Sequence, residues 1–301
     1  MGWGSAATAP ETSGEPPVSV VIPHGGMRAH LALVLAALAA QRYPASRLQV
    51  VVVACPAAED PGRPLPAPEG LAHLEWRRFR RPGFAPAGAR NVGIRAAEGD
   101  LIVSLDDDMV APPGLVAAHA ARHAAGPVAT FGLRRFIRAP GDLLPGPDVH
   151  ARLAALPDLE GSASNRPGAV RDWRTADAPV VAAHPHPYHL FHGCNLSYGR
   201  DLARAVGGWC EQFDGAWGYE DVEFGARLHA AGAVITWVPE ALALHLEGPA
   251  GGAAPPRLRR GRNLRLVTAR VPGYGEFRHR ASGGHAADDQ DPVAREAALR
   301  E

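Results

Sequence analysis

The sequence predicts one α/β domain with a mainly parallel central sheet that is flanked by helices. Short apolar runs at 18–23, 48–54 and 101–105 have the length and composition of buried strands. Longer segments rich in Ala and Leu separate them, and this alternation is typical of a parallel sheet. Ligands of such sheets bind at the carboxyl ends of the strands. Polar residues that directly follow a predicted strand are therefore the first candidates for function.

The first part of the chain supplies most of this pattern. Residues 1–17 are small and polar, and we expect a disordered leader there. The strand at 18–23 ends at a proline, and a turn at 24–26 follows. The later segments are a helix over 27–42, a strand over 48–54, a Pro-rich loop over 56–70, a strand over 73–79, a helix over 86–97, a strand over 101–105 and a helix over 112–125.

The second part is less regular. Residues 139–187 are rich in Pro, Gly and Asp, and we interpret them as a long loop or short helical insertion over the site. The predicted elements around it are strands over 128–137, 191–198 and 234–238, helices over 200–206 and 220–231, and an apolar stretch at 242–245. We expect one domain over 18–247, which the insertion divides into a first half (18–138) and a second half (188–247). Residues 248–301 form a polar extension with a basic cluster at Arg257, Arg259, Arg260 and Arg262 and a loose tail from 280.

Composition limits the classes of function. The formal net charge is zero, with 31 basic and 31 acidic residues, so nothing indicates a nucleic-acid or anionic membrane partner. The three cysteines lack metal-ligand spacing, and their odd number favours a reducing compartment. No signal peptide is evident, and the longest apolar run, at 31–40, is shorter than the ~20 residues of a membrane span. We expect a cytoplasmic protein without a transmembrane segment.

Three consecutive carboxylates, Asp106, Asp107 and Asp108, follow the strand at 101–105. Along an extended strand end, the first and third side chains point to one side and the second points away. Such oxygen ligands suit Mg²⁺ or Mn²⁺. The alternative is a solvated acidic turn, which the residues alone leave open.

A second acidic pair, Glu220 and Asp221, begins the predicted helix at 220–231, behind Trp217, Gly218 and Tyr219. One of the two carboxylates could act as a general base, and the aromatic rings offer faces to a sugar. Acids also stabilise the first turn of a helix, so capping explains one of them.

Other candidates are less specific. His245 follows an apolar stretch and is either a metal ligand or a structural histidine. His184, His186, His189 and His192 are interleaved with proline, which favours a loop over a metal site. Arg90 and Asn91 either bind phosphate or base, or begin a helix.

Taken together, these blocks resemble the family 2 glycosyltransferases of the GT-A fold. The matching segments are Val18-Ser19-Val20-Val21-Ile22-Pro23, Ala89-Arg90-Asn91-Val92-Gly93-Ile94, Leu105-Asp106-Asp107-Asp108 and Trp217-Gly218-Tyr219-Glu220-Asp221-Val222-Glu223-Phe224. The last segment is similar to the galactosyltransferase-type C-terminal block. The resemblance covers about residues 18–247 and implies an inverting displacement.

The resemblance also implies that 18–247 is one catalytic domain, with a nucleotide-binding half (18–138) and an acceptor-binding, catalytic half (188–247). It further implies roles for individual residues. Asp221 would be the catalytic base, supported by Glu220. Asp108 and His245 would hold a divalent metal, Mn²⁺ or Mg²⁺. The nucleotide sugar would contact Pro23, His24, Gly25, Arg90, Asn91, Asp106 and Asp107, and the acceptor or sugar would contact Trp217, Gly218, Tyr219 and Asn195.

The sequence departs from the family pattern in the region that reads the base. Val53-Ala54-Cys55-Pro56 lacks the usual acid after the second strand, and His24-Gly25-Gly26 replaces the usual Thr-Tyr-Asn. We therefore predict a metal-dependent inverting glycosyltransferase with a small-molecule or glycan acceptor. The donor is a nucleotide sugar, and a UDP-sugar is the first candidate. The alternatives are a sugar-phosphate nucleotidyltransferase and a non-catalytic nucleotide-sugar-binding protein.

Overall fold

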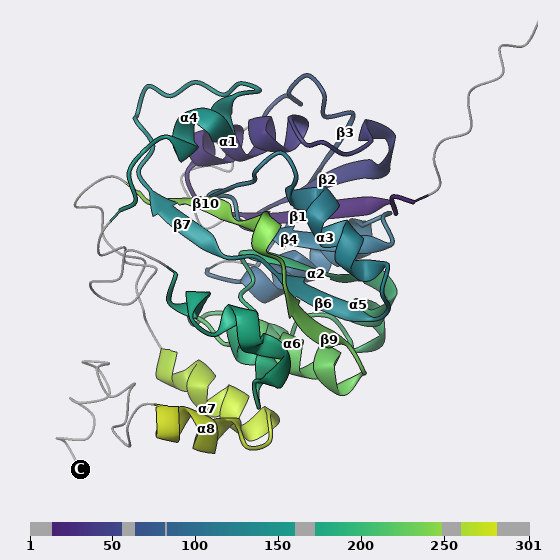
Figure 1. Cartoon of the computed structure of the whole chain (residues 1–301), viewed down its shortest axis with the longest axis vertical. Coiled ribbons are helices and arrows are strands. Elements are labelled where there is room, and N and C mark those ends of the chain that lie inside the picture. The colour runs from purple at the N-terminus through teal and green to yellow at the C-terminus, as the bar shows by residue number, and fades with distance from the viewer. Residues whose placement is uncertain (1–13, 56–63, 82, 160–171, 249–259, 282–301) are drawn as a thin grey trace, which may run out of the picture.

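The computed structural model describes residues 14–55, 64–81, 83–159, 172–248 and 260–281. A seven-stranded sheet runs through its centre with helices on both sides (Figure 1). Only one of its strands, β8, is antiparallel to its neighbours. In spatial order the strands are β3 (His73–Arg78), β2 (Leu48–Ala54), β1 (Val18–His24), β4 (Leu101–Leu105), β8 (Asn195–Gly199), β6 (Val128–Phe131) and β9 (Val234–Trp237).

A smaller sheet lies beside the carboxyl end of β4. It consists of β5 (Met109–Val110), β10 (Ala243–Leu246) and β7 (Arg134–Ile137). The single strand predicted over 128–137 is therefore wrong, because β6 and β7 belong to different sheets. Gly132 lies at the crossing, where a Cβ would come within 2.2 Å of the Ala241 carbonyl oxygen.

The helices cover the two faces of the large sheet. One buried cluster joins Val20 of β1 to α1, and the other joins Val21 to α2 and α6, because alternate strand residues face opposite sides. The helices α1 (Arg28–Ala39), α2 (Pro86–Ala96), α3 (Leu115–His123), α5 (Arg200–Ala205) and α6 (Glu220–Ala230) lie in the predicted places. The predicted insertion contains α4 (Val149–Ala154) and short 3₁₀ turns, and its residues 160–171 lie outside the described part.

Two helices beyond residue 248 were not predicted. The helices α7 (Arg260–Arg270) and α8 (Tyr274–Ala281) lie side by side at one end of the molecule, next to α6 (Figure 1). Val267, Val271 and Tyr274 are buried there. The predicted leader up to residue 13, Arg257 and Arg259 of the basic cluster, and the predicted tail from 282 lie outside the described residues. No helix in the described segments is long and apolar enough to cross a membrane.

Candidate functional site

The three aspartates after β4 have different surroundings. Asp107 Oδ2 accepts hydrogen bonds from His24 Nδ1 (2.6 Å) and from the backbone N–H groups of Gly25 (3.2 Å) and Gly26 (2.9 Å). Asp107 therefore joins the end of β4 to the turn after β1. The side chain of Asp106, by contrast, is 35% exposed, which leaves it accessible at the carboxyl edge of the sheet.

Asp108 faces His245 across the small sheet. The antiparallel pairing of β5 with β10 sets Met109 opposite His245, which brings His245 Nε2 to 3.6 Å from Asp108 Oδ2. The other ring nitrogen, Nδ1, lies 3.3 Å from Glu247 Oε1. The Glu247 carboxylate thus lies against one ring nitrogen of His245, and the Asp108 carboxylate lies against the other. Burial raises the pKa of Asp108 to about 7; Asp107 adds to the rise and His245 opposes it.

This pair fits a divalent cation that also binds a ligand's phosphates. Asp108 Oδ1 is buried and has no hydrogen-bond partner among the described residues. Within those residues, no group of three or more His, Cys, Asp or Glu side chains could hold a metal ion. Magnesium-type sites often use one or two carboxylates and take their remaining oxygens from phosphates and water. Asp108 and His245 together can thus supply the protein's share of such a site.

The second acidic pair sits at the start of α6. Asp221 Oδ2 accepts a hydrogen bond from the Gly193 N–H (3.2 Å), and Oδ1 accepts one from the Val222 N–H (2.8 Å). Burial raises the pKa of Asp221, while the hydrogen bond from Gly193 and the charge of Arg90 oppose the rise. A carboxylate with a raised pKa, held in a fixed direction, is suited to accept a proton.

Arg90 connects the two acidic groups. Its guanidinium is buried over the ring of Trp209, with Nη2 at 2.9 Å from Asp106 Oδ1 and Nη1 at 3.4 Å from Glu220 Oε1. Burial raises the pKa of Glu220 to about 7; Asp221 adds to the rise and Arg90 opposes it. The two segments that the sequence separates by more than a hundred residues therefore meet at one arginine.

The loop before α6 presents an aromatic surface. Trp217 is partly exposed and stacks on Phe84, with ring centroids 5.2 Å apart. Gly218 and Tyr219 both have positive φ, 81° and 70°. The Tyr219 ring is buried and lies beneath the guanidinium of Arg278 in α8, so Trp217 offers the more accessible face.

Several predicted residues have contacts of a structural kind. Asn195 is fully buried, and its Nδ2 donates to the Ala241 carbonyl (2.7 Å) while Oδ1 lies 3.0 Å from His119 Nε2. Asn91 Nδ2 donates to the Trp209 carbonyl, and its Oδ1 accepts from the Trp209 N–H. We therefore leave both asparagines out of the candidate site. The His184, His186 and His189 rings pack on aromatic residues of α8, as part of the covering layer.

Sequence reasoning missed four residues that shape the site. Gly193 leaves room for Arg90, because a Cβ there would lie 2.6 Å from Nη2. Glu247 supports His245, and the charge of Arg134 acts on both Asp106 and Asp108. Asn263 in α7 is fully buried and binds the loop before α6. None of these residues belongs to a recognisable motif, so only their position in space reveals them.

Two family profiles match the chain. The one described as glycosyl transferase family 2 matches residues 19–150, and the one described as the N-terminal domain of galactosyltransferase matches residues 181–246. The first contains Arg90 and the three aspartates. The second contains Glu220, Asp221 and His245.

Two curated relatives and one solved structure place these matches in context. The hyaluronan synthase of Pasteurella multocida is 28% identical over 243 residues, covering 77% of this chain and 25% of that protein. The validoxylamine A glucosyltransferase of Streptomyces hygroscopicus subsp. jinggangensis (strain 5008) is 31% identical over 232 residues, covering 75% and 54%. The chain thus spans about a quarter to a half of these relatives. The crystal structure of GalNAc-T7 with UDP, GalNAc and Mn²⁺ shares the fold, with a TM-score of 0.58 at 16% identity over 85% of this chain and 48% of that one.

Proposed function

Because the chain belongs to glycosyl transferase family 2 and has the GT-A fold, we propose that it is a metal-dependent, inverting glycosyltransferase. It would move a sugar from a nucleotide sugar to a hydroxyl or amine of an acceptor. The donor that we propose first is a UDP-sugar. The observation that carries the proposal is the meeting of Asp106 and Glu220 at Arg90, which supports one site that contains the Asp108–His245 pair and Asp221. Family membership and the α/β fold confirm the resemblance seen in the sequence.

The donor side consists of the residues after β1 and β4. A divalent cation, when bound, neutralises the charge that develops on a leaving diphosphate. Asp108 and His245 would hold that cation, while the accessible carboxylate of Asp106 would accept hydrogen bonds from the ribose. The hydrogen bond from Arg90 fixes the direction of the Asp106 carboxylate. Asp107 holds the turn at His24 and Gly25 next to the end of β4.

The acceptor side consists of the loop before α6 and the first turn of that helix. Asp221 would accept the proton of the attacking hydroxyl, with the Gly193 N–H holding one carboxylate oxygen in place. Trp217 would cover the apolar face of the sugar or acceptor ring. In this scheme Asp221 acts as the base of a single displacement, as the resemblance to the family implies. Inversion at the anomeric carbon follows from that single step.

We propose uridine as the nucleoside of the donor. UDP in the GalNAc-T7 structure supports a uridine donor, and so does the family pattern. Cys55 and the turn at His24 to Gly26 stand where the family has its base-reading residues. The names of the relatives further support a place in bacterial polysaccharide or secondary-metabolite assembly.

Calorimetric titration with UDP, GDP and dTDP, each with and without Mn²⁺, tests the donor side directly. We expect one nucleotide to bind only with Mn²⁺, and Asp108→Ala to abolish that binding. Asp201→Ala is the matched control, because its side chain is 89% exposed on α5. Metal-independent binding, or full binding by the Asp108 variant, would remove the metal from the proposal. Binding of no nucleotide by the folded protein would overturn the transferase assignment.

A further inference from the structure

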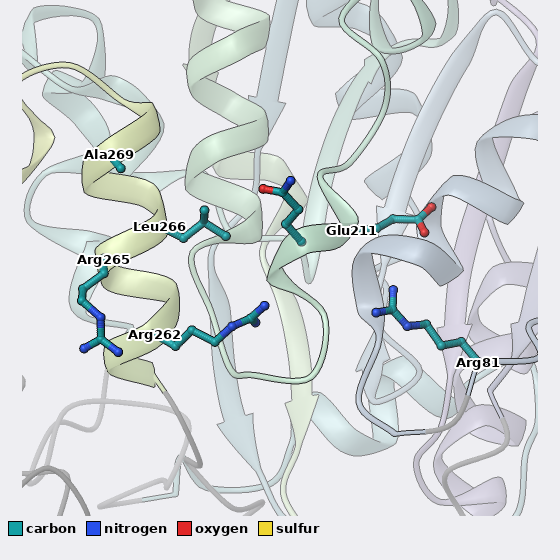
Figure 2. Close-up of a pocket in the computed structure, with 7 residues that line it drawn as sticks. Arg81, Glu211, Arg262, Arg265, Leu266 and Ala269 are labelled. Carbon is teal, nitrogen blue, oxygen red and sulfur yellow. The ribbon is translucent and has the colours of Figure 1, made fainter. Parts of the chain in front are cut away.

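A cavity of about 720 Å³ opens beside the loop that precedes α6 (Figure 2). We call it the arginine pocket, and its lining includes Arg81, Glu211, Gln212, Arg262, Arg265 and Leu266. The helix α7 forms one wall, and the segment before α2 forms the opposite one. In Figure 2 the Arg81 and Arg262 side chains extend toward each other from these two walls. None of the lining residues belongs to the donor site.

The pocket carries more positive charge than its own acids can balance. Among the described residues, Arg262 Nη1 donates only to neutral oxygens, the Asp214 carbonyl (3.3 Å) and Asn263 Oδ1 (3.4 Å). The Arg265 guanidinium has no polar partner among the described residues. The single acid of the lining, Glu211, already accepts a hydrogen bond from Asn91.

The nearby carboxylate of Asp214 does not neutralise the charge of Arg81. Its Nη1 lies 3.7 Å from Asp214 Oδ2, but that carboxylate already accepts hydrogen bonds from the N–H groups of Ala87 (3.0 Å) and Gly88 (3.1 Å) at the start of α2. The Arg81 side chain is 53% exposed, so most of its donors remain available. A chain with no net charge thus concentrates three guanidinium groups at one cavity.

The pocket shares a wall with the proposed acceptor side. Arg262 binds the carbonyl of Asp214, and the next residue, Asn263, binds the carbonyls of Ala216 and Gly218. Trp217 lies between those two carbonyls in sequence. A group bound to Arg262 therefore contacts the same loop that carries Trp217, on which a sugar ring could stack.

We propose that the arginine pocket binds an oxyanion, a carboxylate or phosphate, on the acceptor. The inference rests on the proposed function, since it specifies that site's acceptor class. The planar fork of donors on each arginine matches both oxyanions in a bidentate manner, and a lysine would not. Leu266 and Ala269 supply an apolar side against which a sugar ring can pack. The acceptor would thus be an acidic or phosphorylated saccharide, with its reactive hydroxyl at Asp221 and its charge at the pocket.

The test compares three probes on the full chain by ligand-observed NMR titration: methyl glucoside, methyl glucuronide and glucose 6-phosphate. We expect at least one charged probe to bind tenfold or more tighter than the neutral one. The double variant Arg81→Gln/Arg262→Gln should lose that preference, and Arg95→Gln, an exposed arginine on α2, should keep it. A preference for the glucuronide identifies a carboxylate acceptor, and a preference for the phosphate identifies a phosphorylated one.

Two results would overturn the inference. One is equal binding of charged and neutral probes, and the other is a preference that survives in the double variant. The calorimetric titration with nucleotides and Mn²⁺, run on the same samples, separates this from the proposed function. If the wild type binds nucleotide but shows no probe preference, only the proposed role of the arginine pocket is rejected. If the folded wild type binds no nucleotide, the proposed transferase function is rejected.

Discussion

Asn263 offers the most direct test of how α7 controls the site. Its buried amide nitrogen donates to the carbonyls of Phe213 (2.9 Å), Ala216 (3.2 Å) and Gly218 (2.9 Å). The same loop contains Tyr219, the single non-glycine residue with positive φ in the described segments. That conformation costs a non-glycine residue roughly 1–2 kcal/mol. The amide therefore holds a loop that would relax without it.

The magnitude of its loss follows from these contacts. Two N–H hydrogens shared over three carbonyls contribute about 1–3 kcal/mol net, at ~0.5–1.5 kcal/mol each. Removing them leaves buried carbonyls without a donor, which adds about 1–3 kcal/mol. Partial entry of water offsets part of that cost, so we expect Asn263→Ala to lower the free energy of unfolding by roughly 2–4 kcal/mol.

Hydrogen exchange and kinetics distinguish a clamp on the loop from a general contribution to the fold. In Asn263→Ala the amides of residues 214–219 should exchange faster than those of the central sheet. With the donor saturating, kcat should fall at least tenfold while the Kd for nucleotide stays unchanged. Asn263→Asp keeps the size but replaces the donor with an acceptor, so it should show the same effects. Thr268→Ala, on the same helix, is the control.

The reasoning fails if Asn263→Asp exchanges and reacts like the wild type. Such a result would mean that the three carbonyls find other donors at no cost. Uniformly faster exchange across the whole chain would contradict it as well, because it would show that the residue stabilises the fold rather than the loop.

Three further predictions concern the acidic side chains and their supports. Asp221→Asn should lower kcat by about 10²–10⁴ with nucleotide Kd unchanged, as measured by steady-state kinetics and calorimetry; an active folded variant would exclude the base assignment. Gly193→Ala should displace Arg90, since the new Cβ would lie 2.6 Å from Nη2. It should therefore lower kcat while the circular dichroism spectrum stays that of the wild type. Because burial raises the pKa of Asp221, kcat/KM should fall with decreasing pH before the ordinary carboxyl range of about 4 is reached. A pH–rate profile that stays flat down to pH 4 would contradict this.

Much of the large sheet was predictable because its strands are short, continuous and apolar. β1, β2 and β4 are buried on both faces, so each is a mainly apolar run, interrupted only by polar residues such as Ser19, Gln49 and Ser104. The region 128–137 misled the same reasoning, because both halves have strand composition. What separates them is a close approach of Gly132 to Ala241, a contact that lies 109 residues away in sequence and leaves no local pattern.

The candidate site divides in the same way. Asp106, Asp108, Asp221 and His245 stand in motifs. The structure joins Asp106 through Arg90 to Glu220, the neighbour of Asp221, and sets Asp108 against His245. Asn91 and Asn195 also stand in or near motifs, yet their amides are used up by the backbone of Trp209 and Ala241. A sequence states which residue type is present and not whether its hydrogen bonds are already satisfied. Asn263 is the converse case, since no motif contains it.

Burial of the Glu220 carboxyl beside Arg90 makes the free energy of unfolding depend on pH. Its pKa rises from 4.5 in the unfolded chain to about 7 in the folded one. Between those values the unfolded chain loses this proton first, so the folded state loses stability as pH rises from about 4.5 to 7 and remains less stable above that. A carboxyl that costs the folded state stability, yet lies against Arg90 and next to Asp221, is a candidate for a role in the site rather than in the fold.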